Sequence, residues 1–298
     1  NNIKNPKERF IAFEGAYHGD TFGSMCLTAR GGFNEPFERF MFDVDFIPRP
    51  DGNNNQEVIS LFKKLISKRD TAAFIFEPIV QGASGMNIYS EEVLSKLIKL
   101  ASEADVITIA DEVFTGFGRT GSWLAVDYLE YKPDIICLSK ALTGGFLPLG
   151  LTVVSQKIFD GFYSDEPKHT FLHGHSYTGS PLCCAAANAS LELMSKDGFW
   201  EHIEILSNRM AENINDIHEY SSVRAARSKG LVGAVEIDAG GESSYFNKSG
   251  KVIYKQLLDK GLILRPLGNV FAFVPPHCIT VEELDWMFKQ LKEVITSN

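Results

Sequence analysis

The sequence predicts an α/β fold: a large domain with a mostly parallel sheet and helices on both faces of that sheet, followed by a smaller α+β domain. Three observations carry this prediction. Short runs up to residue 155 are apolar throughout rather than at alternate positions, which is typical of strands buried on both faces. Segments with helical periodicity separate these runs, as in layered α/β proteins. Beyond Pro181 helices and strands follow one another in a mixed order.

Five runs of strand length end in polar or turn residues. They are FIAFEG at 10–15, AAFIFEP at 72–78, VITIAD at 106–111, DIICLS at 134–139 and GLTVVS at 150–155. Because each run is apolar along its whole length, we expect these strands in the parallel sheet of the large domain.

Two helices are predicted between these strands. The first covers residues 54–68 and carries Val58 and Phe62 on its apolar face. The second covers residues 90–104, with Ser90 as a candidate N-cap. Two glutamates follow Ser90 in the first turn, where negative charge stabilises a helix.

The smaller domain is expected to start near Ser195. Its predicted elements are a polar helix at about 197–220, strands in SVRAARSKG and LVGAVEI, a helix near 250–260, strands in GLILRPLG and VFAFVPP, and a last helix from Thr280. We therefore predict a large domain over residues 1–195, ending with the helix that begins at Pro181, and a small domain over residues 196–298.

Composition excludes several classes of partner. The chain has 298 residues, of which 44% are hydrophobic and 22% charged, which is a globular composition. Its net charge of -9 disfavours a nucleic-acid or anionic-membrane partner, because both need basic patches. No apolar run approaches the roughly 20 residues that cross a bilayer. The five cysteines are scattered, odd in number and without a C-x-x-C motif, so we expect reduced thiols and a cytoplasmic protein.

Charged residues stand at the ends of three predicted strands. Glu77, Asp111 and Lys140 each lie at or just beyond such an end. Ligands of open α/β sheets bind beyond the carboxyl ends of the strands, so these side chains are candidates to converge on one pocket. A single lysine after a strand is usually a solvated charge, and it is the combination that favours a site.

A lysine amine paired with a buried carboxylate suits pyridoxal 5'-phosphate as cofactor. The amine forms a Schiff base with the aldehyde, and the carboxylate keeps the pyridine nitrogen protonated so that the ring accepts electrons. Tyr17 in GAYHGDT is a candidate to stack on the ring, with ordinary core packing as the alternative. Thr143, Gly144 and Gly145 are candidates to hold the phosphate, with a simple turn as the alternative.

Five motifs occur in a fixed order: AYHGDTFG, FEPIVQGASGM, ADEVFTGFGRTG, LSKALTGG and HGHSYTGSPLCCAAANASLEL. Together they resemble the class III (ω-type) aminotransferases, which are pyridoxal-phosphate enzymes of fold type I, and the biotin-pathway branch of that family in particular. The resemblance extends from Phe10 to the final helix. It implies an aminotransferase (EC 2.6.1 type) that acts on the keto acid 8-amino-7-oxononanoate, with S-adenosylmethionine, or lysine in some members, as the amino donor.

The resemblance also implies the roles of the residues that would hold the cofactor. Lys140 would be the Schiff-base lysine, and Asp111 would bind the pyridine nitrogen. Tyr17 would stack on one ring face and Val113 would pack against the other, while His18 would belong to the same cofactor site. Ordinary core packing is the alternative for Val113.

The substrate and the second subunit are assigned in the same way. Asp20, Gly174 and Tyr17 would lie at the substrate site, and Arg265 would bind the distal carboxylate of the keto acid, unless it is a solvated strand arginine. Ser176 matches a hydroxyl that reaches the cofactor phosphate of the neighbouring subunit, so a homodimer with shared sites is implied.

Other interpretations stay open. Phe114 stands where ornithine-type relatives carry Gln, which favours the biotin-type or the broad ω-amino acid and amine–pyruvate branches. The segment HGHSYTGSPL favours the biotin branch. No counterpart of the family's N-terminal phosphate loop and first strand precedes Phe10, so an inactive fragment is a further alternative. His173 and His175 resemble a metal pair, but no third ligand is suggested, and we expect no metal.

Overall fold

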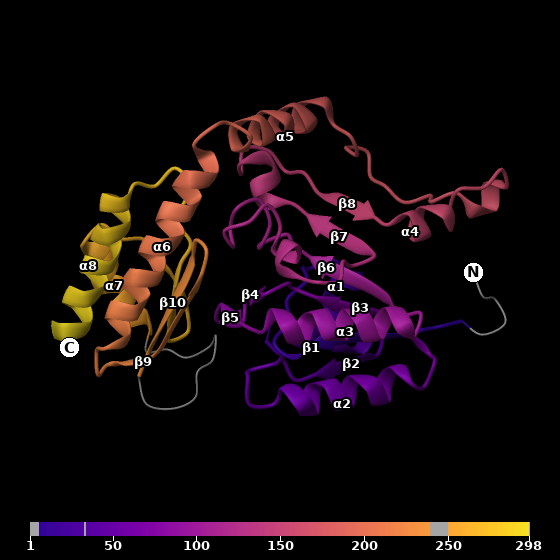
Figure 1. The fold of residues 1–298 in the computed structure, drawn as a ribbon, viewed down its shortest axis with the longest axis horizontal. Helices are drawn as coiled ribbons and strands as arrows, with labels where there is room; N and C mark the ends of the chain where they lie inside the picture. Colours follow the sequence, from indigo (N-terminus) through magenta and orange to yellow (C-terminus); the bar gives the residue numbers. More distant parts are fainter. Residues whose placement is uncertain (1–5, 33, 239–249, 298) are drawn as a thin grey trace. The chain divides into compact units, whose positions relative to one another are not determined.

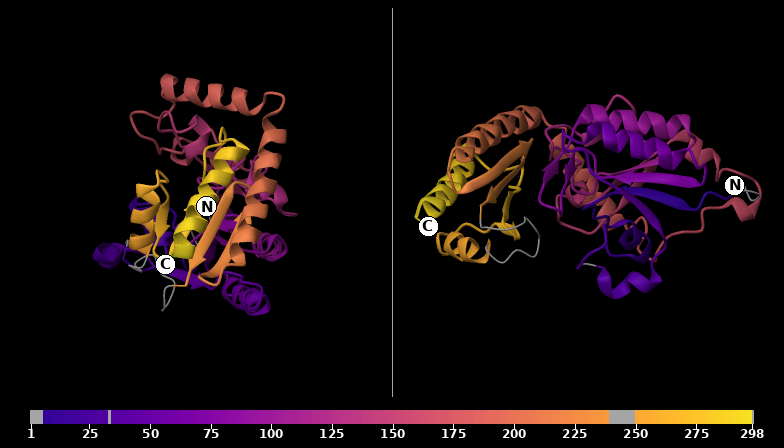
Figure 2. Two further views of the ribbon diagram at one scale, coloured as in Figure 1. Left: turned by 90° about the vertical axis from the view of Figure 1, so that its left-hand side faces the viewer. Right: turned by 90° about the horizontal axis from the view of Figure 1, so that it is seen from below.

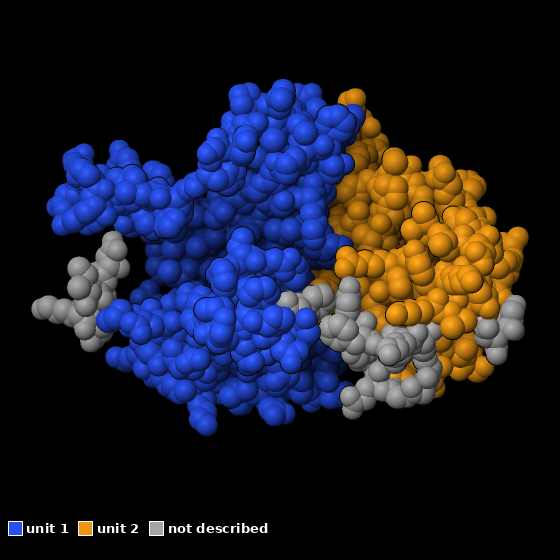
Figure 3. Space-filling view, turned by 180° about the vertical axis from the view of Figure 1, so that it is seen from behind, with its two compact units in different colours: residues 1–79, 89–116, 125–195 blue, residues 80–88, 117–124, 196–298 orange. Residues whose placement is uncertain are grey.

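The computed structural model describes residues 6–32, 34–238 and 250–297. The chain divides into two compact units, which Figure 3 shows in different colours. Unit 1 comprises residues 1–79, 89–116 and 125–195, and unit 2 comprises residues 80–88, 117–124 and 196–298. We call residues 80–88 the first insertion and residues 117–124 the second insertion. Both fall inside the predicted large domain, 1–195, so the structure differs from the prediction in these two segments.

Within the described residues of unit 1, six strands form one sheet in the order β2-β1-β3-β6-β7-β8 (Figure 1). Their bounds are β1 Arg9–Phe13, β2 Val44–Ile47, β3 Thr71–Phe76, β6 Ile107–Asp111, β7 Ile135–Leu138 and β8 Leu151–Val154. All neighbours pair in parallel except β7 and β8. The predicted strands and the mostly parallel sheet are confirmed.

Two features of this sheet differ from the sequence prediction. The strand at 150–155, β8, was expected among parallel strands, but it pairs antiparallel with β7 and all four of its residues are exposed. Apolar content alone does not specify strand direction. The strand β2 was not predicted, because Asp45 interrupts its apolar pattern. The charge is accommodated by Arg9 on the adjacent strand β1, whose guanidinium lies 2.6 Å from the Asp45 carboxylate.

The sheet of unit 1 is covered on both faces. Alternate side chains of β1 and β3 point to opposite sides, so Ala12 and Ile75 contact Leu27 of α1 (Phe22–Leu27) on one face. On the other face Phe74 packs against Phe62 of α2 (Asn55–Ile66), with ring centroids 5.0 Å apart. The helix α3 (Glu91–Glu103) packs beside α2. Figure 2 shows this layered arrangement from below.

The start of α3 confirms the predicted N-cap. The Ser90 hydroxyl accepts a hydrogen bond from the backbone N–H of Val93 at 3.4 Å, and Glu91 and Glu92 occupy the first turn. These groups satisfy a free N–H and complement the helix dipole.

The remaining helical elements of unit 1 are mostly short. They are η1 Glu35–Phe40, η2 Ala125–Tyr128, η3 Lys140–Thr143, α4 Gln156–Asp160, η4 Pro167–His169 and α5 Pro181–Met194. The predicted helix at Pro181 is α5, and it packs against η3. This contact matters below, because η3 begins with Lys140.

Unit 2 has its own sheet and core. Within its described residues, β9 Val223–Lys229, β10 Val232–Ile237, β11 Arg265–Leu267 and β12 Val270–Phe273 form an antiparallel sheet in the order β11-β12-β10-β9. Its helices are α6 Phe199–His218, α7 Gly250–Asp259 and α8 Val281–Ser297. The first insertion carries the small hairpin β4 Val80–Gln81 and β5 Asn87–Ile88.

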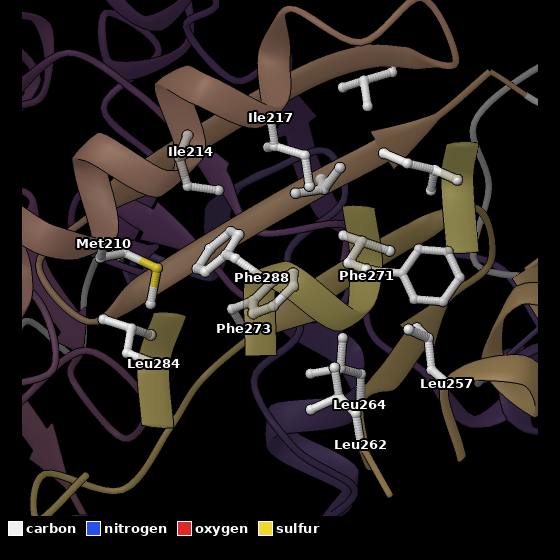
Figure 4. Close-up of a cluster of buried hydrophobic side chains, with 14 of the residues drawn as sticks. Met210, Ile214, Ile217, Leu257, Leu262, Leu264, Phe271, Phe273, Leu284 and Phe288 are labelled. Carbon is white, nitrogen blue, oxygen red and sulfur yellow. The ribbon is translucent and has the colours of Figure 1, made fainter. Parts of the chain in front are cut away.

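The core of unit 2 lies between this sheet and its helices (Figure 4). The rings of Phe273 on β12 and Phe288 on α8 stack with centroids 4.2 Å apart. Gly233 on β10 lets α6 approach closely, since a Cβ atom at this position would lie 2.6 Å from the sulfur of Met210. The small domain predicted as α+β therefore has the expected elements.

Neither a membrane-spanning helix nor a metal-binding cluster is found among the residues that the structure describes. No helix there combines the length and the apolar character needed to cross a membrane. In the same ranges, no group of three or more His, Cys, Asp or Glu side chains is placed so that it could hold a metal ion.

Candidate active site

The residues singled out at the strand ends lie along one edge of the unit 1 sheet. The strands β1, β3, β6 and β7 are consecutive parallel neighbours, so their carboxyl ends share that edge. Tyr17 and His18 follow β1, Glu77 follows β3, Asp111 ends β6, and Lys140 follows β7. The sheet topology therefore brings together the acid and the lysine that the sequence selected.

Asp111 is held by donors from two different segments. Its Oδ2 lies 2.7 Å from Nδ1 of His18, and its Oδ1 accepts the backbone N–H of Val113 at 3.1 Å. The side chains of His18 and Asp111 are only 1% and 11% exposed. Because a carboxylate accepts, the imidazole donates from Nδ1, which fixes the orientation of both groups.

The second ring nitrogen of His18, Nε2, is buried beside the same site. His18 Nε2 is buried and has no hydrogen-bond partner among the described residues. The backbone N–H of His18 donates to the Thr28 hydroxyl at 3.0 Å, which holds the loop after β1 in place. The imidazole is thus fixed by Asp111 on one side and leaves one polar atom unsatisfied on the other.

Lys140 begins η3 immediately after β7, and its side chain is exposed. Its backbone has φ 45°, in the left-handed region that non-glycine residues rarely adopt. Its Nζ lies 5.4 Å from the ring centroid of Phe114, within the range of a cation–π contact. Strained backbone of this kind persists only where the surrounding structure enforces it, and it concentrates at functional sites.

Three hydroxyl groups enforce the conformation of the turn that carries Lys140. Ser139 donates to Leu149 O at 2.7 Å, and Thr143 donates to Leu147 O at 2.5 Å. From α5, Ser190 donates to the carbonyl of Ala141 at 3.1 Å. Sequence reasoning missed Ser139 and Ser190 in this role. Ser190 is a polar residue in a helix of small apolar residues, which was the available signal.

The glycines after Lys140 serve the turn. Gly144 and Gly145 have φ of 61° and 78°, and their N–H groups donate to the carbonyls of Ala141 and Lys140. The Thr143 hydroxyl is engaged within the same loop. Of the two interpretations left open by the sequence, the structure favours turn residues over phosphate donors, since these hydrogen atoms already have acceptors.

Glu77 and Tyr17 are linked through the backbone. Glu77 is buried, and its Oε1 accepts the N–H of Tyr17 at 3.4 Å. Tyr17 itself is half-buried. The neighbouring phenol of Tyr89 is also buried, and burial together with the charges of Glu77 and Asp111 raises its pKa well above the ordinary value, so it stays neutral.

A buried carboxyl group and a half-buried thiol flank Asp111. Glu112 is fully buried, and its carboxylate accepts the Val126 N–H at 2.7 Å and the Thr115 hydroxyl at 2.5 Å. Burial raises its pKa, although these two bonds oppose the shift. Burial, with a contribution from Asp111, also raises the pKa of the Cys137 thiol to about 11, which makes it a poor nucleophile at neutral pH.

The remaining predicted site residues are exposed. Asp20 is exposed in the loop after His18, and Gly174 and Ser176 are exposed in the segment before α5. In that segment the ring Nδ1 of His175 accepts the N–H of Tyr177 at 3.2 Å. Arg265 is exposed on β11 of unit 2. Each unit is described by itself, so the role of Arg265 stays a prediction.

Comparisons with known proteins agree with the motifs. The class-III aminotransferase family model matches residues 2–295. An adenosylmethionine-8-amino-7-oxononanoate aminotransferase from Synechococcus elongatus is 41% identical, covering 99% of this chain and 70% of the relative. The protein of the same name from Helicobacter pylori is 34% identical, covering 97% of this chain and 67% of the relative.

Solved structures give the same result for the fold. The crystal structure of the Methanocaldococcus jannaschii adenosylmethionine-8-amino-7-oxononanoate aminotransferase superposes with a TM-score of 0.91 at 33% identity, covering 99% of this chain and 69% of that one. A PLP-bound amine transaminase from an uncultivated Pseudomonas species has a TM-score of 0.89 at 26% identity, covering 97% and 69%. The α/β architecture of fold type I is thereby confirmed, and the chain belongs to the class-III aminotransferase family.

Proposed function

We propose that the protein transfers an amino group to 8-amino-7-oxononanoate, forming 7,8-diaminononanoate in biotin biosynthesis, with pyridoxal 5'-phosphate as cofactor and S-adenosylmethionine as donor. One observation carries the chemistry: Lys140 and the His18-paired carboxylate of Asp111 stand at the carboxyl ends of neighbouring parallel strands, at one sheet edge. The names of the relatives, at 33–41% identity over nearly the whole chain, support the substrate.

The residues present fit this cofactor. An aldehyde needs a reachable amine, and Lys140 is exposed at the strand end. A pyridine nitrogen needs a fixed carboxylate, and Asp111 is oriented by His18 and Val113. The half-buried Tyr17 follows β1 of the same sheet and offers an aromatic face. When bound, the cofactor supplies an electron sink for the bond that breaks at the substrate carbon.

The side chains of the candidate site would have different roles in the reaction. Lys140 would bind the cofactor aldehyde and, once displaced by the amino donor, take a proton from the substrate carbon and return it at the cofactor. Asp111 would hold the proton on the pyridine nitrogen, and His18 would hold Asp111 in position. Tyr17 and Val113 would confine the ring from its two faces.

Substrate binding is proposed for Arg265, Asp20, Tyr17 and Gly174. Arg265 would grip the distal carboxylate of the keto acid, because a guanidinium can donate two parallel hydrogen bonds to it. Asp20, Tyr17 and Gly174 would line the remainder of the substrate site. Arg265 precedes Pro266 on β11, which restricts the local backbone and helps to aim the side chain.

A homodimer with shared sites is part of the proposal. Large apolar side chains are exposed throughout residues 146–193, including Phe146, Phe171, Leu172, Tyr177, Leu182 and Leu193. Exposed apolar surface on this scale is typical of a protein–protein interface. Ser176 lies within this segment, which agrees with its assignment to the cofactor phosphate of the neighbouring subunit.

A direct assay tests the proposed function. The full-length protein is incubated with 8-amino-7-oxononanoate, pyridoxal phosphate and either S-adenosylmethionine or lysine, and 7,8-diaminononanoate is measured by mass spectrometry, with Lys140→Ala as the inactive control. Product with either donor supports the proposal and identifies the donor. Phe114 keeps the amine–pyruvate branch as a second candidate, and consumption of pyruvate and an amine without diaminononanoate would establish that branch instead. No turnover with any pair would favour an inactive protein.

A further inference from the structure

The two insertions follow residues of the candidate site closely in the sequence. The first insertion follows Glu77, and the second follows the segment from Asp111 to Gly116. Both insertions belong to unit 2, while the residues on either side of each belong to unit 1. Each insertion therefore begins a few residues after a residue of the candidate site.

Hydrogen bonds within unit 1 join the residues before each insertion to the residues after it. At the first, the N–H of Tyr89 donates to the carbonyl of Ile79 at 3.1 Å. At the second, the buried Glu112 carboxylate bridges Thr115, before the insertion, and Val126, after it. These bonds hold the residues that flank each insertion in the loops that carry the site residues.

The first insertion is held in unit 2 by Arg227 on β9. Its guanidinium donates to the carbonyl of Met86 at 2.9 Å and to the carbonyl of Gly85. It also lies 3.7 Å from the Glu236 carboxylate, which keeps the charge compensated. The Arg227 side chain thus holds the turn of the β4–β5 hairpin against the sheet edge of unit 2.

Arg119 holds the second insertion by the same chemistry. Its guanidinium donates to Pro275 O at 2.7 Å and to Leu231 O at 3.2 Å, and its own carbonyl accepts the Leu231 N–H at 2.9 Å. Packing is close here, since a Cβ atom on Gly230 would lie 2.2 Å from the backbone of Thr120. Burial lowers the pKa of Arg119 to about 10, so the guanidinium stays charged at neutral pH.

Strained residues stand where the chain enters each insertion. Ile79 and Phe117 have φ of 66° and 59°, although neither is glycine. For a β-branched residue such as Ile79 this backbone region is an outlier, and such strain persists only when the surrounding structure enforces it. The backbone of these two residues is therefore held by its local surroundings.

We propose that Arg119 and Arg227 are positioning residues for the cofactor site: each holds one insertion, and the chain on either side of that insertion continues into the loops that carry Glu77 and Asp111. For Arg227 the route runs through the first insertion to Glu77 and from its carboxylate to the backbone of Tyr17. This inference rests on the proposed function, because it assigns the loops to a pyridoxal-phosphate site.

Arg227→Met tests the proposal, with Arg224→Met as the matched control. Arg224 lies on the same strand, also approaches Glu236, at 3.6 Å, and pairs with Asp238 at 2.7 Å. Full-length proteins are compared by hydrogen exchange of residues 80–88 and 16–18, by the pyridoxal phosphate dissociation constant, and by the pH midpoint of the visible absorption of the bound cofactor.

In Arg227→Met we expect faster exchange in both segments, a shifted pH midpoint and a dissociation constant raised about 2- to 30-fold, the range typical of coupling through packed networks. Arg227→Lys should recover part of each change, and Arg224→Met should change none. Unchanged exchange at 80–88, or faster exchange there with the Tyr17 segment and the cofactor unaffected, would overturn the inference. If the wild-type protein takes up no pyridoxal phosphate, the proposed function fails, and the exchange data still decide whether Arg227 couples the two segments.

Discussion

Replacement of His18 by leucine is expected to weaken pyridoxal phosphate binding about 30-fold while the fold is retained. His18 Nδ1 lies 2.7 Å from Asp111 Oδ2, and the two side chains are 1% and 11% exposed, so water cannot readily replace the lost donor. A hydrogen bond to a charged group contributes about 1.5–3 kcal/mol. A loss of about 2 kcal/mol corresponds to about 30-fold in an equilibrium constant.

A double-mutant cycle measures this effect without relying on turnover. The pyridoxal phosphate dissociation constant is determined for the wild type, His18→Leu, Asp111→Ala and the double variant. His18→Leu should lose affinity in the wild-type background and lose almost none once Asp111 is absent. His218→Leu, at an exposed position at the end of α6, is the control for removal of an imidazole. If the binding free energy lost by the double variant equals the sum of the two single losses to within about 0.5 kcal/mol, the positioning role of His18 is refuted.

Three further predictions follow from the site and from unit 2. Arg265→Ala should weaken use of the keto acceptor by about 2–5 kcal/mol, as for a truncated charge pair, and an unchanged kcat/KM for the acceptor would remove Arg265 from the substrate site. In a homodimer with shared sites, activity should fall on dilution together with the dimer fraction measured by ultracentrifugation, and Ser176→Ala should weaken cofactor binding; a fully active monomer would contradict this. Burial, with Arg119 and His202, lowers the pKa of His277 from 6.5 to about 4, so between these pH values the unfolded chain binds the extra proton and stability rises with pH. Urea unfolding should show a loss of about 2 kcal/mol from pH 7 to pH 5 that shrinks in His277→Leu, and equal losses in both proteins would exclude His277 as the source.

Elements that are specified by nearby residues in the sequence could be predicted. Elements that depend on contacts with residues far away in the sequence could not. The helix α3 was predictable because Ser90 caps it and its apolar residues share one face. The strand β2 was missed because Asp45 needs Arg9, a residue far away in the sequence, to become acceptable in a sheet. The direction of β8 could not be predicted either, since an apolar run is compatible with both orientations.

The same distinction applies to the site. The strand-end rule selected Lys140 and Asp111, because parallel strands place their carboxyl ends at one edge whatever their separation in sequence. That His18 pairs with Asp111 depends on side chains 93 positions apart, and no spacing rule indicates it. The bonds from Arg119 and Arg227 that hold the two insertions in unit 2 end on backbone carbonyls, which carry no sequence signature.

The central claim is that Lys140 carries pyridoxal phosphate at the edge of the unit 1 sheet. The most direct measurement is borohydride reduction of the full-length protein after incubation with pyridoxal phosphate, followed by proteolysis and mass spectrometry of the peptide containing LSKALTGG. We predict a pyridoxyl group on Lys140 Nζ, present in the wild type and absent from Lys140→Ala. A label on another lysine, or no label in a folded wild-type protein, would contradict the account.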